Sequence, residues 1–164
     1  MVHVQKLRSI ACDIIRVVRE WRVVLDTNVL VASFRSDRGA SRKILLNVLS
    51  RKIPVLVSVP LMIEYEAVLT RPEQLAATGL TISETNAVLD ALAAVAEPVS
   101  LRFLWRPRLK DPADEMVLET AVNGRANRLV TFNVRHLKEA AAEFGIPAVT
   151  PPQIWKEMEF LEKK

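Results

Sequence analysis

The stretch Arg22-Val23-Val24-Leu25-Asp26-Thr27-Asn28-Val29-Leu30 decides the fold of this chain. Residues 23–25 are apolar and mostly β-branched, which predicts a short strand buried on both faces. An acid, a hydroxyl and an amide follow, and these residue types favour helix starts over strands. Because ligands in open α/β sheets bind beyond the carboxyl ends of strands, Asp26 is the first candidate for chemistry. The alternative is that Asp26 or Thr27 only caps the following helix.

Length and composition indicate one globular domain. The chain has 164 residues, of which 50% are hydrophobic and 26% are charged. A net charge of +4 is compatible with a nucleic-acid partner without demonstrating one. Cys12 is the single cysteine, which excludes an internal disulfide and favours a reducing compartment, so we expect a cytoplasmic protein. No apolar run approaches the 18 residues typical of a membrane span.

Segments typical of strands and of helices alternate along the chain. The expected strands cover 23–25, 55–58, 98–101, 128–131 and 147–149. The expected helices cover 28–34, 40–49, 60–69, 72–77, 83–95, 111–123, 134–143 and 151–160, with Ser83 as a helix cap and Gly124 as a helix end. This order predicts an α/β protein with three layers, α/β/α, around a central parallel sheet of about five strands.

Residues 1–21 precede this pattern and carry apolar side chains at helical spacing. We interpret them as an amphipathic N-terminal extension, and residues 22–164 as the domain. The extension could pack on the domain, pack on a partner chain, or be poorly ordered.

Polar side chains follow four of the expected strands. They are Asp26 after the first, Glu64 one turn into the helix after the second, Asp111 and Asp114 after the third and its loop, and Thr131 and Asn133 after the fourth. Because parallel strands share one carboxyl edge, these groups can converge. Oxygen ligands of this kind suit Mg²⁺ or Mn²⁺, which activates water and stabilises charge on a phosphate. Taken singly, each residue is better explained as a helix cap or a surface acid than as a metal ligand, and only the set of several at successive strand ends favours a metal site.

Four motifs together carry a resemblance to a known family. They are Leu25-Asp26-Thr27-Asn28-Val29-Leu30, Ser58 with Glu64 six residues later, Asp111-Pro112-Ala113-Asp114, and Val130-Thr131-Phe132-Asn133. In order and approximate spacing they resemble a PIN domain, from about Arg22 to Trp155. Within that family, the pattern resembles the VapC-like branch, the toxins of type II toxin–antitoxin systems.

The resemblance implies a PIN-like fold and a Mg²⁺- or Mn²⁺-dependent endoribonuclease that cuts single-stranded RNA. Asp26, Glu64 and Asp114 would be the catalytic metal ligands, with Asp111 as a nearby candidate and Thr131 as support. A cognate antitoxin and a homodimer are also implied. Asn28 either orients the Asp26 carboxylate or caps its helix.

Asn133 departs from the family pattern, because many PIN domains have an acid at this position. The site therefore loses a charge, which leaves open a weak or inactive module that binds RNA or a protein partner. A phosphoryl hydrolase with Asp26 as nucleophile, similar to haloacid dehalogenases, is disfavoured. Such an enzyme needs a second Asp at the place of Asn28.

Two groups of basic residues are candidates for RNA contacts. One comprises Arg102, Arg106, Arg108 and Lys110 around Trp105, and the other comprises Arg35, Arg38, Arg42 and Lys43. We expect Arg35, Arg38, Arg106, Arg108 and Lys110 to hold single-stranded RNA through phosphate attraction. The alternative is a solvated loop with Trp105 in the core. We expect His136 to be a surface or partner contact rather than a catalytic base.

Overall fold

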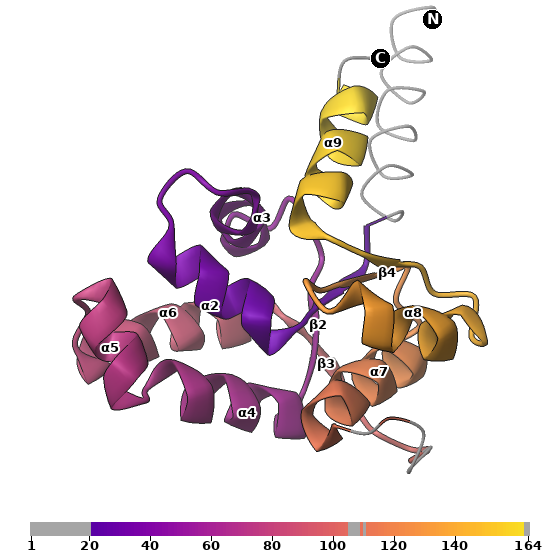
Figure 1. Cartoon of the computed structure of the whole chain (residues 1–164), viewed down its shortest axis with the longest axis horizontal. Coiled ribbons are helices and arrows are strands. Elements are labelled where there is room, and N and C mark those ends of the chain that lie inside the picture. The colour runs from indigo at the N-terminus through magenta and orange to yellow at the C-terminus, as the bar shows by residue number, and fades with distance from the viewer. Residues whose placement is uncertain (1–20, 105–108, 110, 163–164) are drawn as a thin grey trace, which may run out of the picture.

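Short parallel strands run through the middle of the molecule in the computed structural model, which describes residues 21–104, 109 and 111–162 (Figure 1). In this part of the chain they are β1 (Val23–Leu25), β2 (Leu56–Ser58), β3 (Glu97–Val99), β4 (Arg128–Val130) and β5 (Ala148–Val149). One sheet has the order β1-β4-β5, and β2 pairs with β3 in a second. An isolated parallel bridge between Val23 and Val55 joins β1 to the chain just before β2.

Helices surround these strands. The described residues form α2 (Thr27–Arg35), α3 (Ala40–Leu49), α4 (Val59–Leu69), α5 (Pro72–Thr78), α6 (Ile82–Val95), α7 (Pro112–Gly124), α8 (Val134–Ala142) and α9 (Pro151–Glu162). In Figure 1, α2, α4, α5 and α6 lie to one side of the strands, and α7 and α8 lie to the other. The predicted α/β class with parallel strands and a PIN-like α/β/α fold is confirmed, although the larger sheet has only three strands.

The core is built on β1 and α7. All three residues of β1 are buried, as expected for a strand covered on both faces. Helix α7 contacts β1, β2, β3 and β4, so it is the main cover of this part of the sheet. Tyr65 of α4 is also fully buried, and its hydroxyl donates a hydrogen bond to the Leu25 carbonyl oxygen. The end of β1 is therefore fixed from two directions.

Helix α6 begins before the predicted position, and the prediction of Ser83 as its cap is wrong. Thr81 is the N-cap: its hydroxyl accepts from the Glu84 backbone N–H at 3.2 Å, and its own N–H donates to Glu84 Oε2 at 2.9 Å. This reciprocal pair gives a hydrogen-bond partner to two backbone N–H groups at once. Ser83 has Asn86 three residues later, where a capping box needs Glu or Gln.

Gly124 does not end α7 in the way that the sequence predicts. It is the last helical residue, and the left-handed position follows at Arg125, whose φ is 52°. A Cβ atom on Gly124 would lie 2.9 Å from Val99 Cγ2 and 3.0 Å from Leu56 Cδ1. The glycine therefore serves the close packing of α7 on β2 and β3 rather than a left-handed turn.

Residues 1–20 of the predicted extension lie outside the described residues, and the division into extension and domain stays a prediction. Trp21 is described and buried, with the Arg128 guanidinium 5.4 Å from the centroid of its ring. Within the described ranges, no helix combines the length and apolar character that a membrane span requires.

Candidate functional site

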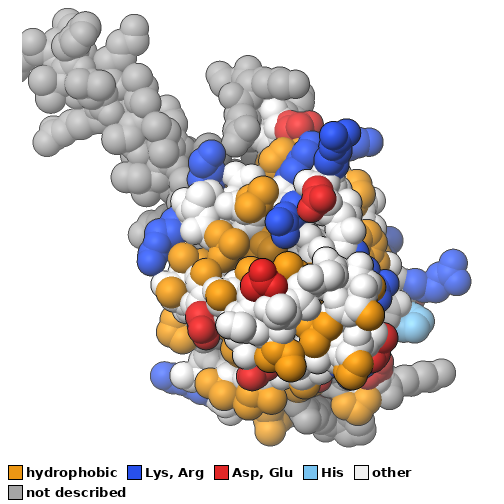
Figure 2. All heavy atoms as spheres, turned by 90° about the vertical axis from the view of Figure 1, so that its left-hand side faces the viewer, with side chains coloured by type: hydrophobic (Ala, Val, Ile, Leu, Met, Phe, Trp, Pro, Cys, Tyr) orange, Lys and Arg blue, Asp and Glu red, His pale blue; other side chains and the backbone are white. Residues whose placement is uncertain are grey.

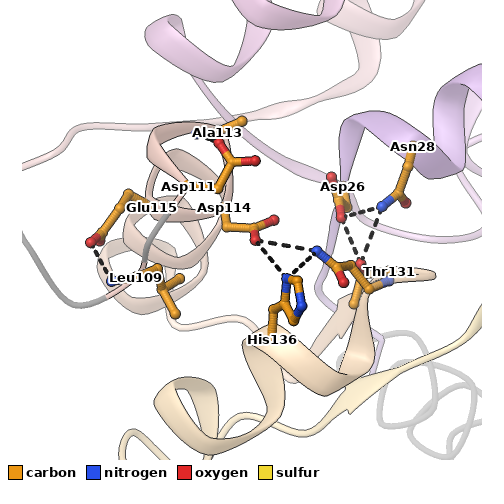
Figure 3. Close-up of polar contacts among 10 residues, drawn as sticks. Asp26, Asn28, Leu109, Asp111, Ala113, Asp114, Glu115, Thr131 and His136 are labelled. Atoms are coloured by element: carbon orange, nitrogen blue, oxygen red, sulfur yellow. Dashed lines mark hydrogen bonds and ion pairs between the residues drawn. The ribbon is translucent and has the colours of Figure 1, made fainter.

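The pairing of β1 with β4 places Asp26 beside Thr131. Leu25 is opposite Val130 in this parallel ladder, so the next residue of each strand lies at the same edge. The Asp26 backbone N–H donates to the Val130 carbonyl oxygen at 2.9 Å, and Thr131 Oγ1 donates to Asp26 Oδ2 at 2.6 Å (Figure 3). Both side chains are buried. The strand register thus fixes a carboxylate and its hydroxyl donor together.

Asn28 holds the same carboxylate from the first turn of α2. Its Nδ2 donates to Asp26 Oδ2 at 2.7 Å, and its Oδ1 accepts from the Phe132 backbone N–H at 3.3 Å. Asp26 occupies the N-cap position of α2 but its side chain makes no capping hydrogen bond. Of the two roles left open for Asn28, the geometry matches orientation of the Asp26 carboxylate.

Asp111 and Asp114 differ in their surroundings because they occupy different positions at the start of α7. Asp114 is the third residue of the helix, is 7% exposed, and faces the Asp26 side of the site in Figure 3. Asp111 is exposed and accepts from the Ala113 backbone N–H at 2.9 Å. Asp111 therefore caps α7 and acts on Asp114 through its charge, whereas Asp114 lies within the site.

Asn133 and His136 approach Asp114 from the start of α8. Asn133 Nδ2 lies 3.3 Å from Asp114 Oδ2 and 3.0 Å from His136 Nδ1. His136 Nδ1 is itself 3.9 Å from Asp114 Oδ2. Figure 3 draws these contacts as dashed lines that meet beside the labelled Asp114 and His136. The amide that replaces the acid of the family pattern therefore bridges a carboxylate and an imidazole.

Glu64 is not joined to these residues. It is half-buried on α4, and within the described part of the chain its carboxylate makes no hydrogen bond or ion pair. Among the described residues, no three or more His, Cys, Asp or Glu side chains form a group that could hold a metal ion. The acids whose charges act on Asp114 are Asp26 and Asp111.

Burial raises the pKa of the Asp26 carboxyl above its ordinary value, although the Thr131 hydroxyl and the donors of Asn28 partly oppose this. Burial is also the largest cause of the raised pKa of Asp114, and the charges of Asp26 and Asp111 raise it further. His136 and Asn133 act in the opposite direction on Asp114. Two carboxylates that are costly to ionise side by side make a place that favours a cation.

We expect Asp26 and Asp114 to lower the stability of the metal-free protein as the pH rises above about 4. Unfolded Asp releases its proton near pH 3.9, whereas the raised folded-state pKa of Asp26 and Asp114 delays release to higher pH. The folded state therefore binds more protons in this window, and the free energy of unfolding falls with pH. Denaturation in urea with EDTA should show Asp26→Asn gaining stability over the wild type as pH rises. A difference that does not change with pH would contradict this.

The donor set fits a hard divalent cation. Asp26 and Asp114 would supply carboxylate oxygens, and Mg²⁺ sites commonly use one or two carboxylates together with substrate phosphates. Burial makes the ionised form of both groups unfavourable and raises the pKa of each, and the hydrogen bonds from their described neighbours only partly oppose this. A third protein ligand is therefore not required for the fit.

The predicted RNA contacts are only partly described. Arg35 and Arg38 are exposed, and Arg35 Nε donates to Gln74 Oε1 at 3.0 Å. Arg35 ends α2, about 12 Å along the helix axis from the residue after Asp26. Figure 2 shows Lys and Arg side chains gathered in the upper part of one face. Arg106, Arg108 and Lys110 lie outside the described residues, as does Trp105.

Three features of the site were missed by sequence reasoning. Tyr65 lies under the end of β1, and the charge of Asp26 adds to burial in raising its pKa. Ser58 and Thr120 share a buried hydrogen bond of 2.7 Å that ties the end of β2 to α7. His136 is exposed, as expected for a surface contact, but its contact with Asn133 was not predicted. That contact had a usable signal, because a side chain three residues after Asn133 falls on the same side of a starting helix.

Comparison with known proteins gives one family. No curated protein matches the chain. A family model described as a PIN domain matches residues 22–135, which include Asp26, Asp114, Thr131 and Asn133 and stop one residue before His136. The match covers well over half of the sequence. It includes the residues at the carboxyl ends of β1 and β4 that form the site. The chain therefore belongs to the PIN-domain family.

Proposed function

We propose that the protein is a metal-dependent endoribonuclease that hydrolyses phosphodiester bonds of single-stranded RNA. PIN domains are generally nucleases, and PIN-domain nucleases generally use divalent metal ions. The observation that carries the proposal is the pair of buried carboxylates, Asp26 and Asp114, at the carboxyl edge of the strands. Each has a raised pKa, and the charge of Asp26 acts on Asp114.

In this proposal Asp26 and Asp114 hold a Mg²⁺ or Mn²⁺ ion. When bound, such an ion lowers the pKa of water and offsets negative charge on a phosphate. Thr131 and Asn28 fix the orientation of the Asp26 carboxylate through Oδ2. Both acids are largely shielded from solvent, which strengthens their electrostatic effects on a bound phosphodiester. Glu64 remains a proposed third acid on the helix that follows β2.

A matched pair of variants tests the site. We expect Asp114→Asn to lower metal-dependent cleavage of a mixed single-stranded RNA pool at least about a hundredfold, because a carboxylate ligand becomes a neutral amide. Asp111→Asn should lower activity by no more than a few fold, because Asn caps a helix as well as Asp and Asp111 acts on the site only through its charge on Asp114. The assay compares Mg²⁺, Mn²⁺ and EDTA. Full activity in Asp114→Asn, or cleavage unaffected by EDTA, would contradict the proposal.

Binding of the RNA is assigned to Arg35, Arg38, Arg106, Arg108 and Lys110. Exposed guanidinium and ammonium groups neutralise phosphates, and binding of this kind weakens steeply with salt. The exposure of Arg35 and Arg38 supports this assignment for the described part of the set.

A VapC-like toxin role is the finer form of the proposal, with a cytoplasmic location, a homodimer and a cognate antitoxin that covers the acidic site. The support is the similarity of the four motifs. Val59 and Ile63 are 73% and 60% exposed and lie four residues apart on α4, as a pairing surface would require. Light scattering measures the dimer. Growth of cells that express the wild type or Asp26→Asn measures the toxin role.

An inactive module that binds RNA or a protein partner is the second candidate. Two observations favour it: Asn133 supplies no charge, and Glu64 does not join Asp26 and Asp114 in a group of metal-binding acids within the described residues. RNA binding without metal and without turnover would select this alternative.

A further inference from the structure

We propose that Asp114, Asn133 and His136 together bind a divalent transition-metal ion, through one carboxylate oxygen, one amide oxygen and one imidazole nitrogen. His136 is the new ligand: it lies just beyond the residues that the PIN-domain model matches. The site shares Asp114 with the proposed nuclease centre, and only its role in RNA cleavage rests on the proposed function.

The separations of the three polar atoms fit a single ion. Asn133 Nδ2 is 3.0 Å from His136 Nδ1 and 3.3 Å from Asp114 Oδ2. His136 Nδ1 and Asp114 Oδ2 are 3.9 Å apart. Three points with these separations lie on a circle with a radius of about 2.0 Å, which is close to the bond lengths of Zn²⁺ and Mg²⁺ to nitrogen and oxygen. An ion near the centre would touch all three without movement of the backbone.

The amide of Asn133 can present oxygen at this position. Its Nδ2 lies within hydrogen-bond distance of both Asp114 Oδ2 and His136 Nδ1, so the end of this side chain already points between the two groups. A rotation of 180° about the terminal bond exchanges oxygen and nitrogen, which have nearly the same shape. Asn133 Oδ1 accepts no hydrogen bond from any described residue, so the rotation breaks no other contact of this side chain.

The backbone around the site is held in place. The Asn133 N–H donates to Thr131 Oγ1 at 2.8 Å, and the same hydroxyl donates to Asp26 Oδ2. The His136 N–H donates to the Asn133 carbonyl oxygen at 3.1 Å in the first turn of α8. Asp26 and Asp111 add negative charge around Asp114, which favours a cation further. Supporting contacts of this kind orient ligands in metal sites.

The donor set selects among metals. Mg²⁺ prefers oxygen ligands and keeps several waters, whereas imidazole nitrogen suits transition-metal ions. The side chain of His136 is 63% exposed, so an ion and its remaining waters can reach it from solvent. We therefore expect Mn²⁺ to bind more tightly than Mg²⁺, and His136 to account for the difference.

Manganese binding to the untagged protein tests the site without RNA. Pulsed electron paramagnetic resonance should detect a nitrogen coupled to bound Mn²⁺ in the wild type. We expect this coupling to vanish in His136→Ala, and the Mn²⁺ affinity to fall at least about tenfold. His3→Ala, which removes the other histidine of the chain, should leave both unchanged. The Mg²⁺ affinity of His136→Ala should stay within about twofold of the wild type.

The outcomes separate this site from the nuclease proposal. Absence of nitrogen coupling in the wild type, or wild-type Mn²⁺ affinity in His136→Ala, would overturn the site even if Mg²⁺-dependent RNA cleavage persists. Nitrogen coupling that depends on His136 supports the site even if no RNA is cut. Circular dichroism checks folding, and Asn133→Ala provides a second ligand variant that should weaken Mn²⁺ binding.

Discussion

Replacing Asp26 by Asn is expected to reduce metal-dependent RNA cleavage by at least about a thousandfold, equivalent to about 4 kcal/mol of transition-state stabilisation. Asp26 is the acid that three elements hold in place: it ends β1, and its Oδ2 accepts from Thr131 on the exit of β4 and from Asn28 on α2. Asparagine is close to aspartate in size and can still accept both hydrogen bonds through its oxygen. The charge is therefore removed while the geometry is kept.

The control for this variant is Asp90→Asn, which neutralises an exposed acid on α6. Its cleavage rate should equal that of the wild type with Mg²⁺ or Mn²⁺. Equal cleavage by wild type and Asp26→Asn would show that the activity belongs to a contaminant or to another site. Asp26→Asn should also unfold at higher urea than the wild type at neutral pH without metal, because burial of the charged carboxylate is unfavourable.

Replacing Leu118 by Ala is expected to lower the free energy of unfolding by about 2–5 kcal/mol. Leu118 is completely buried on α7, the helix that contacts β1, β2, β3 and β4. It lies one turn after Asp114, so both side chains are on the same side of the helix. The cavity left by the substitution would loosen the helix that positions Asp114, and urea denaturation monitored by circular dichroism measures the loss.

Two further variants show whether the effect comes from burial. Leu118→Met nearly conserves side-chain volume and should cost less than about 1.5 kcal/mol. Leu46→Ala removes the same atoms from an α3 side chain that is 52% exposed. It should lower the free energy of unfolding much less than Leu118→Ala does. A Leu118→Ala protein as stable as Leu46→Ala would mean that α7 does not support the core as described.

The strand-end residues show how far local sequence can predict a site. Asp26 follows a continuous apolar run, and the acids and amides after later strands are expected at the same edge because parallel strands share their direction. Thr131 beside Asp26 follows from this rule as soon as β1 pairs with β4. The same rule cannot predict whether a side chain that lies further along the following helix points into the site. Glu64 on α4 illustrates this, since among the described residues it forms no metal-binding group with Asp26 and Asp114.

Glycine and capping residues show the limits of reading helix ends. Gly124 was predicted as a helix end, yet close packing against Leu56 and Val99 is its structural reason. These two side chains are far from Gly124 in sequence. Thr81 and Glu84, in contrast, form a cap that is visible in the sequence, because the spacing of three residues is local.

The sequence by itself determined the α/β order, the parallel strands, the PIN-domain family and the acids at the strand ends, because these depend on local periodicity and on motifs of a few residues. Only the tertiary structure decided that Asp111 caps while Asp114 enters the site, that Asn28 orients Asp26, and that Asn133 joins Asp114 to His136. Each of these depends on distances and directions between side chains from different elements. Such geometry is set by how α7 and α8 pack on the strands, and no single stretch of sequence encodes it.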